Sequence, residues 1–120
     1  MTRVAAIDCG TNSIRLLVAD GHIGEDGRPH LCDLTRPMRI VRLGQGVDAR
    51  GYLDPAAIER TVEAVVEYQR MIEALGATST RFVATSATRD ASNSADFVRQ
   101  IKAIIGVEPE VVVGTEEASL

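Results

Sequence analysis

The 120-residue sequence predicts an α/β protein in which helices cover a sheet, and two observations lead to this fold class. Aromatic residues make up only 3% of the chain and tryptophan is absent, so Val, Ile, Leu and Ala must build the core. Small branched side chains suit strands that are buried beneath helices. The apolar segments also follow the order β-β-β-α-β-α-β, and the length predicts one domain or part of one.

Charge and composition exclude several functional classes. The chain carries 13 Lys and Arg against 17 Asp and Glu, a net charge of −4, which disfavours a broad nucleic-acid-binding surface. No apolar run approaches the roughly 18–20 residues that span a bilayer, and the N-terminus lacks the apolar stretch of a secretory signal. Cys9 and Cys32 are too few for a disulfide scaffold. We therefore expect a cytoplasmic protein without nucleic-acid or membrane partners.

The first quarter of the chain predicts a β-hairpin. Residues 3–8 form a short apolar strand, and Gly, Thr, Asn and Ser in residues 9–13 favour a tight turn. Residues 14–20 resume as a second strand, and five residues between two strands are typical of a hairpin. Three Gly and one Pro in residues 21–29 predict an exposed loop.

The middle of the chain predicts a bent strand and a long helix. Residues 31–43 read as a strand that is interrupted at Pro37, which cannot donate to a ladder, and a glycine-rich loop follows. Asp54 and Pro55 form a strong helix start, and Gly76 ends the helix. One apolar stripe at steps of three and four runs through Ile58, Val62, Val65, Tyr68, Ile72 and Leu75.

The last third predicts a further strand, helix and strand. Residues 81–85 form the strand, and a helix that is capped by Asn93 or Ser94 ends at Gly106. Residues 111–113 form the last strand, after which a helical segment begins. Three polar clusters follow three of these strands.

The first cluster is Asp8 together with the turn at residues 10–13. A carboxylate that closes a strand, followed by Gly and short polar residues, presents amides and hydroxyls to one point, where an anionic oxygen or a hydrated cation can bind. The alternative is a polar hairpin turn capped by an Asp.

The second cluster contains Ser86, Thr88 and Arg89, at the carboxyl end of a strand, where open α/β sheets bind ligands. The Arg89 guanidinium suits a phosphate. The alternative is a salt bridge from Arg89 to Asp90 or Asp96.

The third cluster is Glu116 and Glu117, which follow Gly114 just past the last strand. Two carboxylates there can orient a water nucleophile or bind a cation. They would equally favour the first turn of a helix. Elsewhere, His22 and His30 are interpreted as solvated loop residues, and Cys9 lacks the basic neighbour that a catalytic thiolate needs.

Together the three clusters resemble the motifs of the exopolyphosphatase and guanosine pentaphosphate phosphohydrolase family, Ppx/GppA. Residues 6–18 resemble its first phosphate-binding hairpin, residues 85–91 with Asn93 its second motif, and residues 114–118 its third. The resemblance implies a ribonuclease-H-like domain of the fold shared by actin, Hsp70 and sugar kinases. Residues 1–120 would be the amino-terminal half or less of a longer chain, and the domain would be incomplete at its carboxyl end.

The resemblance also implies roles for individual residues. Asp8 would sit near magnesium, Glu117 would polarise the attacking water and Glu116 would support it. The phosphate-binding residues would be Gly10, Thr11, Asn12, Ser13, Ser86, Thr88 and Arg89.

The activity implied is the release of terminal orthophosphate from inorganic polyphosphate by magnesium-assisted attack of water, with guanosine pentaphosphate as the alternative substrate. Half an active site would leave the 120 residues inactive by themselves. A non-catalytic polyphosphate or alarmone sensor and an ATP-binding structural module are the rival hypotheses, and a homodimer is an open expectation. Because the chain is acidic overall, a polyanion would need locally focused positive charge, for which Arg15, Arg42 and Arg89 are candidates.

Overall fold

The computed structural model describes residues 2–44, 51–84 and 91–111. Six strands and two helices lie within these residues. They are β1 (Thr2–Cys9), β2 (Ser13–Ile23), β3 (Pro29–Thr35), β4 (Met38–Ile40), α2 (Pro55–Leu75), β5 (Ser79–Ala84), α4 (Ser94–Ile105) and β6 (Glu110–Val111). The predicted α/β class and the order of its elements are confirmed, with the expected third strand divided into β3 and β4 around Pro37.

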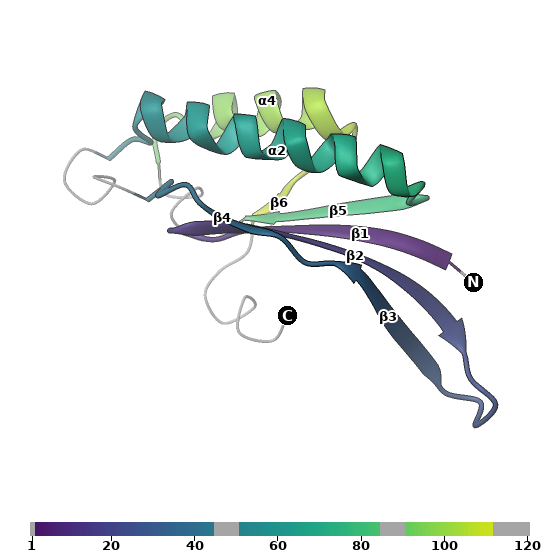
Figure 1. The fold of residues 1–120 in the computed structure, drawn as a ribbon. Coiled ribbons are helices and arrows are strands. Elements are labelled where there is room, and N and C mark those ends of the chain that lie inside the picture. Colours follow the sequence, from purple (N-terminus) through teal and green to yellow (C-terminus); the bar gives the residue numbers. More distant parts are fainter. Residues whose placement is uncertain (1, 45–50, 85–90, 112–120) are drawn as a thin grey trace.

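One mixed sheet holds all six strands. Its order is β3-β2-β1-β5-β6, and β4 also pairs with β2. β1 and β2 form the predicted antiparallel hairpin, whereas β5 and β6 run parallel to β1 and to each other. Both helices lie on the same face of the sheet (Figure 1). This face holds the core.

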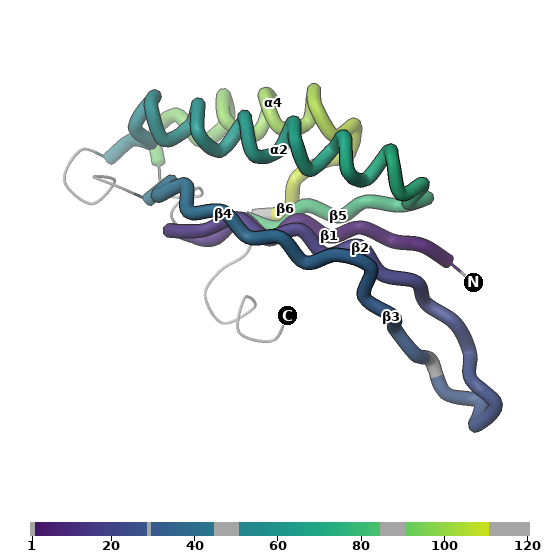
Figure 2. The backbone as a smooth tube through the Cα atoms, viewed as in Figure 1, coloured from purple at the N-terminus to yellow at the C-terminus, as the bar shows by residue number. Residues whose placement is uncertain are grey.

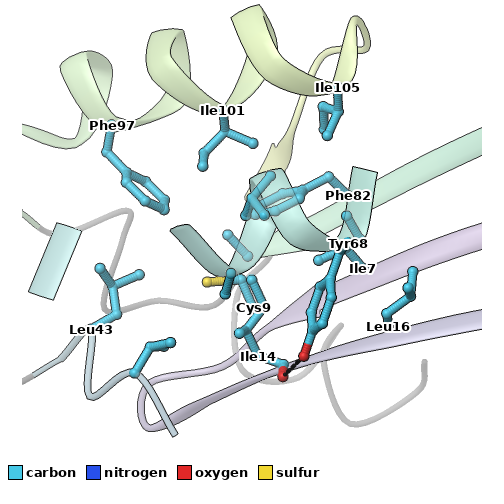
Figure 3. Close-up of a cluster of buried hydrophobic side chains, with 14 of the residues drawn as sticks. Ile7, Cys9, Ile14, Leu16, Leu43, Tyr68, Phe82, Phe97, Ile101 and Ile105 are labelled. Atoms are coloured by element: carbon cyan, nitrogen blue, oxygen red, sulfur yellow. Dashed lines mark hydrogen bonds between the residues drawn. The ribbon is translucent and has the colours of Figure 1, made fainter. Parts of the chain in front are cut away.

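The core confirms the composition argument. Alternate residues of β1 and β2, among them Ile7, Cys9 and Ile14, are buried under the helices because side chains alternate between the faces of a strand. Figure 3 shows these side chains on the sheet side of the core, with Phe97 and Ile101 projecting toward the same core from α4. Three of the four aromatic residues lie in the centre of the core, since Tyr68, Phe82 and Phe97 are each no more than 1% exposed.

Helix α2 begins and ends where the sequence predicts. The Asp54 side chain accepts a hydrogen bond from the Ala56 amide at 2.9 Å, and Pro55 occupies the first turn. Gly76 closes the helix in the left-handed conformation, with φ 73°. The buried Tyr68 hydroxyl donates to the Ile14 carbonyl of β2 at 2.9 Å (Figure 3), which fixes the helix over the start of that strand.

The predicted loop at residues 21–29 is wrong in its bounds. β2 continues to Ile23 and β3 starts at Pro29, so β2 and β3 run together as a long arm (Figure 2). His22 and His30 are consequently strand residues, paired in register with stacked rings 5.5 Å apart, although both are solvent-exposed as expected. The turn is shorter than predicted and occupies residues 24–28, where Gly24 and Gly27 lie, because backbone pairing between the two strands continues up to Ile23 and Pro29.

Other details at the ends of the elements also differ from the prediction, and β5 begins two residues before the predicted strand at residues 81–85. The strand expected to reach Leu43 ends at Ile40. Asn93 occupies the N-cap position of α4 without making a capping hydrogen bond, because its side chain is bonded elsewhere. The predicted strand at residues 111–113 begins one residue earlier, at Glu110, and its last two residues lie outside the described part of the chain.

An ion pair between β1 and β2 holds the arm formed by β2 and β3 against the rest of the sheet. Arg3 of β1 donates two hydrogen bonds to the Asp20 carboxylate, at 2.7 and 3.0 Å, and a third to the Leu75 carbonyl at 2.6 Å. The hydrogen bonds from Arg3 lower the pKa of the Asp20 carboxyl below its ordinary value. Arg3 thereby links β1, on which it lies, to β2 and to the end of α2.

Candidate phosphate-binding site at the strand ends

The hairpin turn after β1 is the part of the predicted site that the structure describes. The Gly10 amide donates to the Ser13 carbonyl at 2.8 Å, which closes the turn. A Cβ at Gly10 would lie 3.2 Å from that same carbonyl oxygen, so the tight turn favours glycine. Thr11 and Asn12 are exposed at its tip.

Residues 41–44 support this turn from one side. The Asn12 carbonyl accepts hydrogen bonds from the amides of Val41 and Arg42, at 3.0 and 2.9 Å, and the Thr11 carbonyl accepts one from Gly44 at 2.8 Å. The Arg60 side chain of α2 in turn donates to the Val41 carbonyl at 3.0 Å. The turn is therefore held by long-range bonds in addition to its own.

This support decides which way the turn's amides point. Carbonyl and N–H groups of a trans peptide point in opposite directions, and the described chain holds no cis peptide bond. The amides of Asn12 and Ser13 consequently point away from residues 41–44. Consecutive amides turned toward one side favour an anionic oxygen.

Asp8 lies beside this turn, on the sheet face opposite the helices. It is exposed, and its register partners are Arg15 on β2 and Val83 on β5. Asp8 and Arg15 line an open hollow of about 590 Å³ together with Arg36 and Met38. One carboxylate and two guanidinium groups thus share a hollow next to the candidate anion-binding turn.

The donor set at Asp8 fits magnesium better than a transition metal. Among residues 2–44, 51–84 and 91–111, no group of three His, Cys, Asp or Glu side chains could hold a metal ion. Mg²⁺ is commonly held by one or two carboxylates, water and substrate phosphates, so a single exposed carboxylate suffices. Asp8 is the residue that would hold it.

Strand register brings together, at one edge of the sheet, the described ends of the three strands that precede the predicted clusters. Cys9 pairs with Ala84, and Ala84 pairs with Val111, in parallel ladders. Neighbouring strands lie about 4.8 Å apart, so the three strand ends span about 10 Å. Ser86, Thr88, Arg89, Glu116 and Glu117 lie outside the described residues, but the strands that precede them end side by side.

Cys9 is a residue of the hydrophobic core and not of the candidate phosphate-binding site. Its side chain is fully buried, and Figure 3 shows its sulfur among the apolar side chains. Burial, with a smaller contribution from the Asp8 charge, raises the pKa of the Cys9 thiol to about 12. The expectation that Cys9 is no nucleophile is supported, because the thiolate is the reactive form.

The suggested pairing of Asp96 with Arg89 has a competitor, since Asp96 forms an ion pair with Arg99.

The sequence analysis missed residues that reach the site from more distant parts of the chain. Arg36 and Met38 of the hollow and Val41 beneath the turn carry no local signal of a site. Gly44 carried one, as part of a glycine-rich loop. A Cβ on Gly44 would clash with the Thr11 methyl, so any side chain at position 44 would force the Thr11 side chain to move.

A mixed sheet of this topology, with a tight turn at the end of its first strand and helices on one face, defines a protein of the actin and sugar-kinase-like fold. A family model described as the Ppx/GppA phosphatase family matches residues 22–120. The chain belongs to this family. The resemblance seen in the sequence is thus confirmed.

Individual relatives agree with this assignment. Exopolyphosphatase 2 of Mycobacterium tuberculosis is 49% identical over the whole chain, which covers 39% of that protein. A solved exopolyphosphatase-like protein is 45% identical with a TM-score of 0.87, over 98% of this chain and 34% of that one. A Ppx/GppA family member from Aquifex aeolicus is 34% identical with a TM-score of 0.85, over 97% and 36% of the two chains. The chain therefore spans little more than a third of the length of these relatives.

Neither described helix is long and apolar enough to cross a membrane.

Proposed function

We propose that the full-length protein carrying this chain hydrolyses phosphoanhydride bonds and releases terminal orthophosphate from inorganic polyphosphate. The observation that carries the proposal is that Cys9, Ala84 and Val111 lie side by side on neighbouring strands, each of which precedes or closes with one of the three polar clusters in the sequence. The names of the relatives, exopolyphosphatase 2 above all, support polyphosphate as the substrate class. Residues 1–120 would form the amino-terminal, ribonuclease-H-like domain and supply one side of the site.

The hairpin turn would hold phosphate oxygens. Its outward amides and the side chains of Thr11, Asn12 and Ser13 would take up the oxygens of the chain end, with Gly10 allowing the close approach. Ser86, Thr88 and Arg89 would bind from the neighbouring strand end. Phosphoryl transfer depends mostly on positioning and charge neutralisation, which such groups supply.

The chemical step would need a base for water. Glu117 would accept a proton while the water oxygen bonds to the terminal phosphorus and the bridging P–O bond breaks, with Glu116 in a supporting role. Asp8 would hold Mg²⁺, which when bound supplies charge neutralisation for the phosphate oxygens.

Loss of activity in a Glu117→Gln variant tests the mechanism. We expect the full-length protein to release orthophosphate from long-chain polyphosphate with magnesium, and the variant to lose at least about 100-fold in kcat, in the range of general-base catalysis. Binding of polyphosphate should survive, since Gln keeps the size of Glu. Equal activity in the variant would remove Glu117 from the mechanism.

The same assay separates the alternatives. Faster release of orthophosphate from guanosine pentaphosphate than from polyphosphate would make the nucleotide the substrate. Tight polyphosphate binding without hydrolysis in either protein would indicate a sensor. Protection by ATP alone would indicate a structural nucleotide-binding module.

A further inference from the structure

Two arginines reach the hollow beside Asp8 from different parts of the sheet. Arg15 lies on β2, next to Asp8 of β1, and Arg36 lies in the short connection between β3 and β4. The Pro37 carbonyl of this connection accepts a hydrogen bond from the Leu16 amide at 3.1 Å, so the backbone next to Arg36 is fastened to β2. The place of Arg36 at the hollow is therefore set by a long-range bond within the sheet.

The hollow extends across three neighbouring strands. Asp8 of β1 pairs with Arg15 of β2, and Arg15 pairs with Met38 of β4, so these residues form a row on the face opposite the helices. Because neighbouring strands lie about 4.8 Å apart, the row from Asp8 to Met38 is about 10 Å long. The hollow measures about 590 Å³, within the range of roughly 300–1,000 Å³ that is typical of ligand pockets. It is thus larger than a single phosphate group requires.

The Arg36 guanidinium has a weak partner at the hollow. Its side chain is 72% exposed, and it forms an ion pair with the Asp33 carboxylate at 3.3 Å. An ion pair between two exposed side chains contributes little to stability, because water solvates both charges when they are apart. Two oxygens of a phosphate group, by contrast, can accept two parallel hydrogen bonds from one guanidinium. A phosphate group in the hollow would therefore compete well with Asp33 for Arg36.

Arg39, three residues further along, lies in a different environment. Its register partner is Ile14, whose side chain is buried beneath the helices, so Arg39 lies on the helix side of the sheet. There it donates to the Glu67 carboxylate of α2 at 2.5 Å. The two arginines are close in sequence and equal in charge, but Arg36 borders the hollow whereas Arg39 faces a helix.

We propose that Arg36 binds a phosphate group of polyphosphate that lies several groups behind the terminal one, and that it thereby favours long chains over short ones. The terminal phosphate would lie at the hairpin turn and Asp8, the following groups would pass Arg15, and Arg36 would exchange Asp33 for a phosphate. The inference rests on the proposed function, since it extends the same site along the sheet. Arg36 is a specificity-determining residue in this arrangement, because it contacts the substrate away from the reacting bond.

An Arg36→Ala variant of the full-length protein tests the proposal with two substrates. The KM for long-chain polyphosphate should rise about tenfold, the lower end of what a hydrogen bond to a charged group contributes. The KM for tripolyphosphate should stay within about twofold, because three phosphate groups are shorter than the row of about 10 Å between Asp8 and Met38. The kcat should stay within about twofold for both substrates, since the reacting bond lies elsewhere.

Arg39→Ala is the matched control, since it removes the same charge from the helix side of the sheet. Its KM for long-chain polyphosphate should stay within about twofold of the wild-type value. An equal rise in both variants would show that Arg36 acts only through the net charge of the protein. An Arg36→Ala protein with an unchanged KM, or with equal increases for the two substrates, would also overturn the proposal.

An Asp33→Asn variant distinguishes substrate binding from a structural ion pair. If Asp33 competes with the substrate for Arg36, the variant should lower the KM for long-chain polyphosphate about threefold, in keeping with the small free energy of an exposed ion pair. Asp26→Asn, which removes the same charge at the tip of the arm, should change this KM far less. A pair that merely held the connection between β3 and β4 in place would be damaged alike by Arg36→Ala and Asp33→Asn. Increases in KM of similar size in both would reduce Arg36 to a structural residue.

Direct binding separates this inference from the proposed function. Calorimetry of full-length Glu117→Gln, with and without Arg36→Ala, measures the Kd of long-chain polyphosphate and of tripolyphosphate without turnover. A wild-type protein that binds polyphosphate but releases no orthophosphate would defeat the proposed function, and the two Kd values would still decide the role of Arg36. An active wild-type protein whose Arg36→Ala change leaves the Kd of long chains unaltered would overturn the inference alone. A protein that binds neither compound would overturn both.

Discussion

Single atoms decide how closely residues 41–44 approach the hairpin turn. Gly44 lies so near Thr11 that any side chain would collide with the threonine methyl, while the threonine hydroxyl belongs to the proposed phosphate site. The two residues are therefore matched in size, and the match can be tested by changing both.

We expect Gly44→Ala to reduce the rate of polyphosphate hydrolysis by about tenfold, because the added Cβ must push the Thr11 side chain, and with it the hydroxyl of the proposed phosphate site, out of place. Adding Thr11→Ser should restore most of the rate, since serine lacks the methyl and keeps the hydroxyl. The measurement is kcat of Gly44→Ala, of the double variant and of Thr11→Ser alone. A double variant no better than Gly44→Ala would place the damage elsewhere.

The two cysteines differ in environment and should differ in reactivity. Cys32 is exposed on β3, whereas Cys9 is buried with its pKa raised to about 12. At pH 8 a thiol reagent should label Cys32 within minutes and leave Cys9 unmodified until the protein unfolds. Peptide mapping by mass spectrometry checks this, and labelling of both residues at equal rates in the folded protein would contradict the burial of Cys9.

At the scale of elements, the helix α2 controls where the hairpin lies. Its apolar stripe packs on the sheet, while Tyr68 adds a directed bond to the carbonyl of Ile14, one residue into β2. The apolar contacts fix the helix on the face of the sheet, and the hydroxyl fixes it along the strand.

Tyr68→Phe should lower the free energy of unfolding by about 0.5–1.5 kcal/mol, because the hydrogen bond from the buried hydroxyl to the Ile14 carbonyl would be lost. Urea unfolding, followed through the exchange of β1 and β2 amides in the full-length protein, measures this. Tyr52→Phe is the matched control, since Tyr52 is 40% exposed and its loss of a hydroxyl should change little. Equal effects from the two variants would rule out the special role of the bond to Ile14.

At the scale of the whole molecule, the ion pair between Arg3 and Asp20 makes the stability of the arm depend on pH. Arg3 lowers the pKa of the Asp20 carboxyl below the value of about 4 that an unfolded chain gives. A carboxyl with a depressed folded pKa contributes stability above its unfolded pKa, and that contribution disappears as the pH falls through the folded pKa. The arm should therefore loosen in acid.

An Asp20→Asn variant should be less stable than the wild type at pH 7, and the difference should shrink below about pH 4. Urea unfolding between pH 7 and pH 2.5, with exchange of β2 amides as the readout, measures the difference. Asp33→Asn removes an exposed carboxylate 3.3 Å from Arg36 and is the control, for which a smaller effect is expected. A difference between Asp20→Asn and wild type that is constant with pH would show that the pair does not titrate as argued.

Positively charged side chains lie exposed near the proposed phosphate site. Arg15 and Arg42 are both exposed at the hairpin, as the sequence expectation of locally focused charge requires, although the chain as a whole is acidic. Polyphosphate affinity should fall with rising salt if these residues attract the polyanion.

The sequence by itself determined the features that depend on neighbours a few residues apart. Alternation along β1 and β2, the Asp54 and Pro55 helix start and the Gly76 stop all follow from local backbone chemistry, and the structure confirms them. The three motifs were recognisable for the same reason, because each is a short run of residues whose types the chemistry requires.

Only the tertiary structure decided the contacts that join distant segments. Residues 41–44 support the hairpin turn, and Asn93 binds Leu53 forty positions away. Asn93 itself shows why: its residue type predicts a helix cap, but an amide that has both a donor and an acceptor goes to whichever backbone the fold brings within reach. Local patterns fix what a residue can bind, and the packing of the chain fixes which partner it meets.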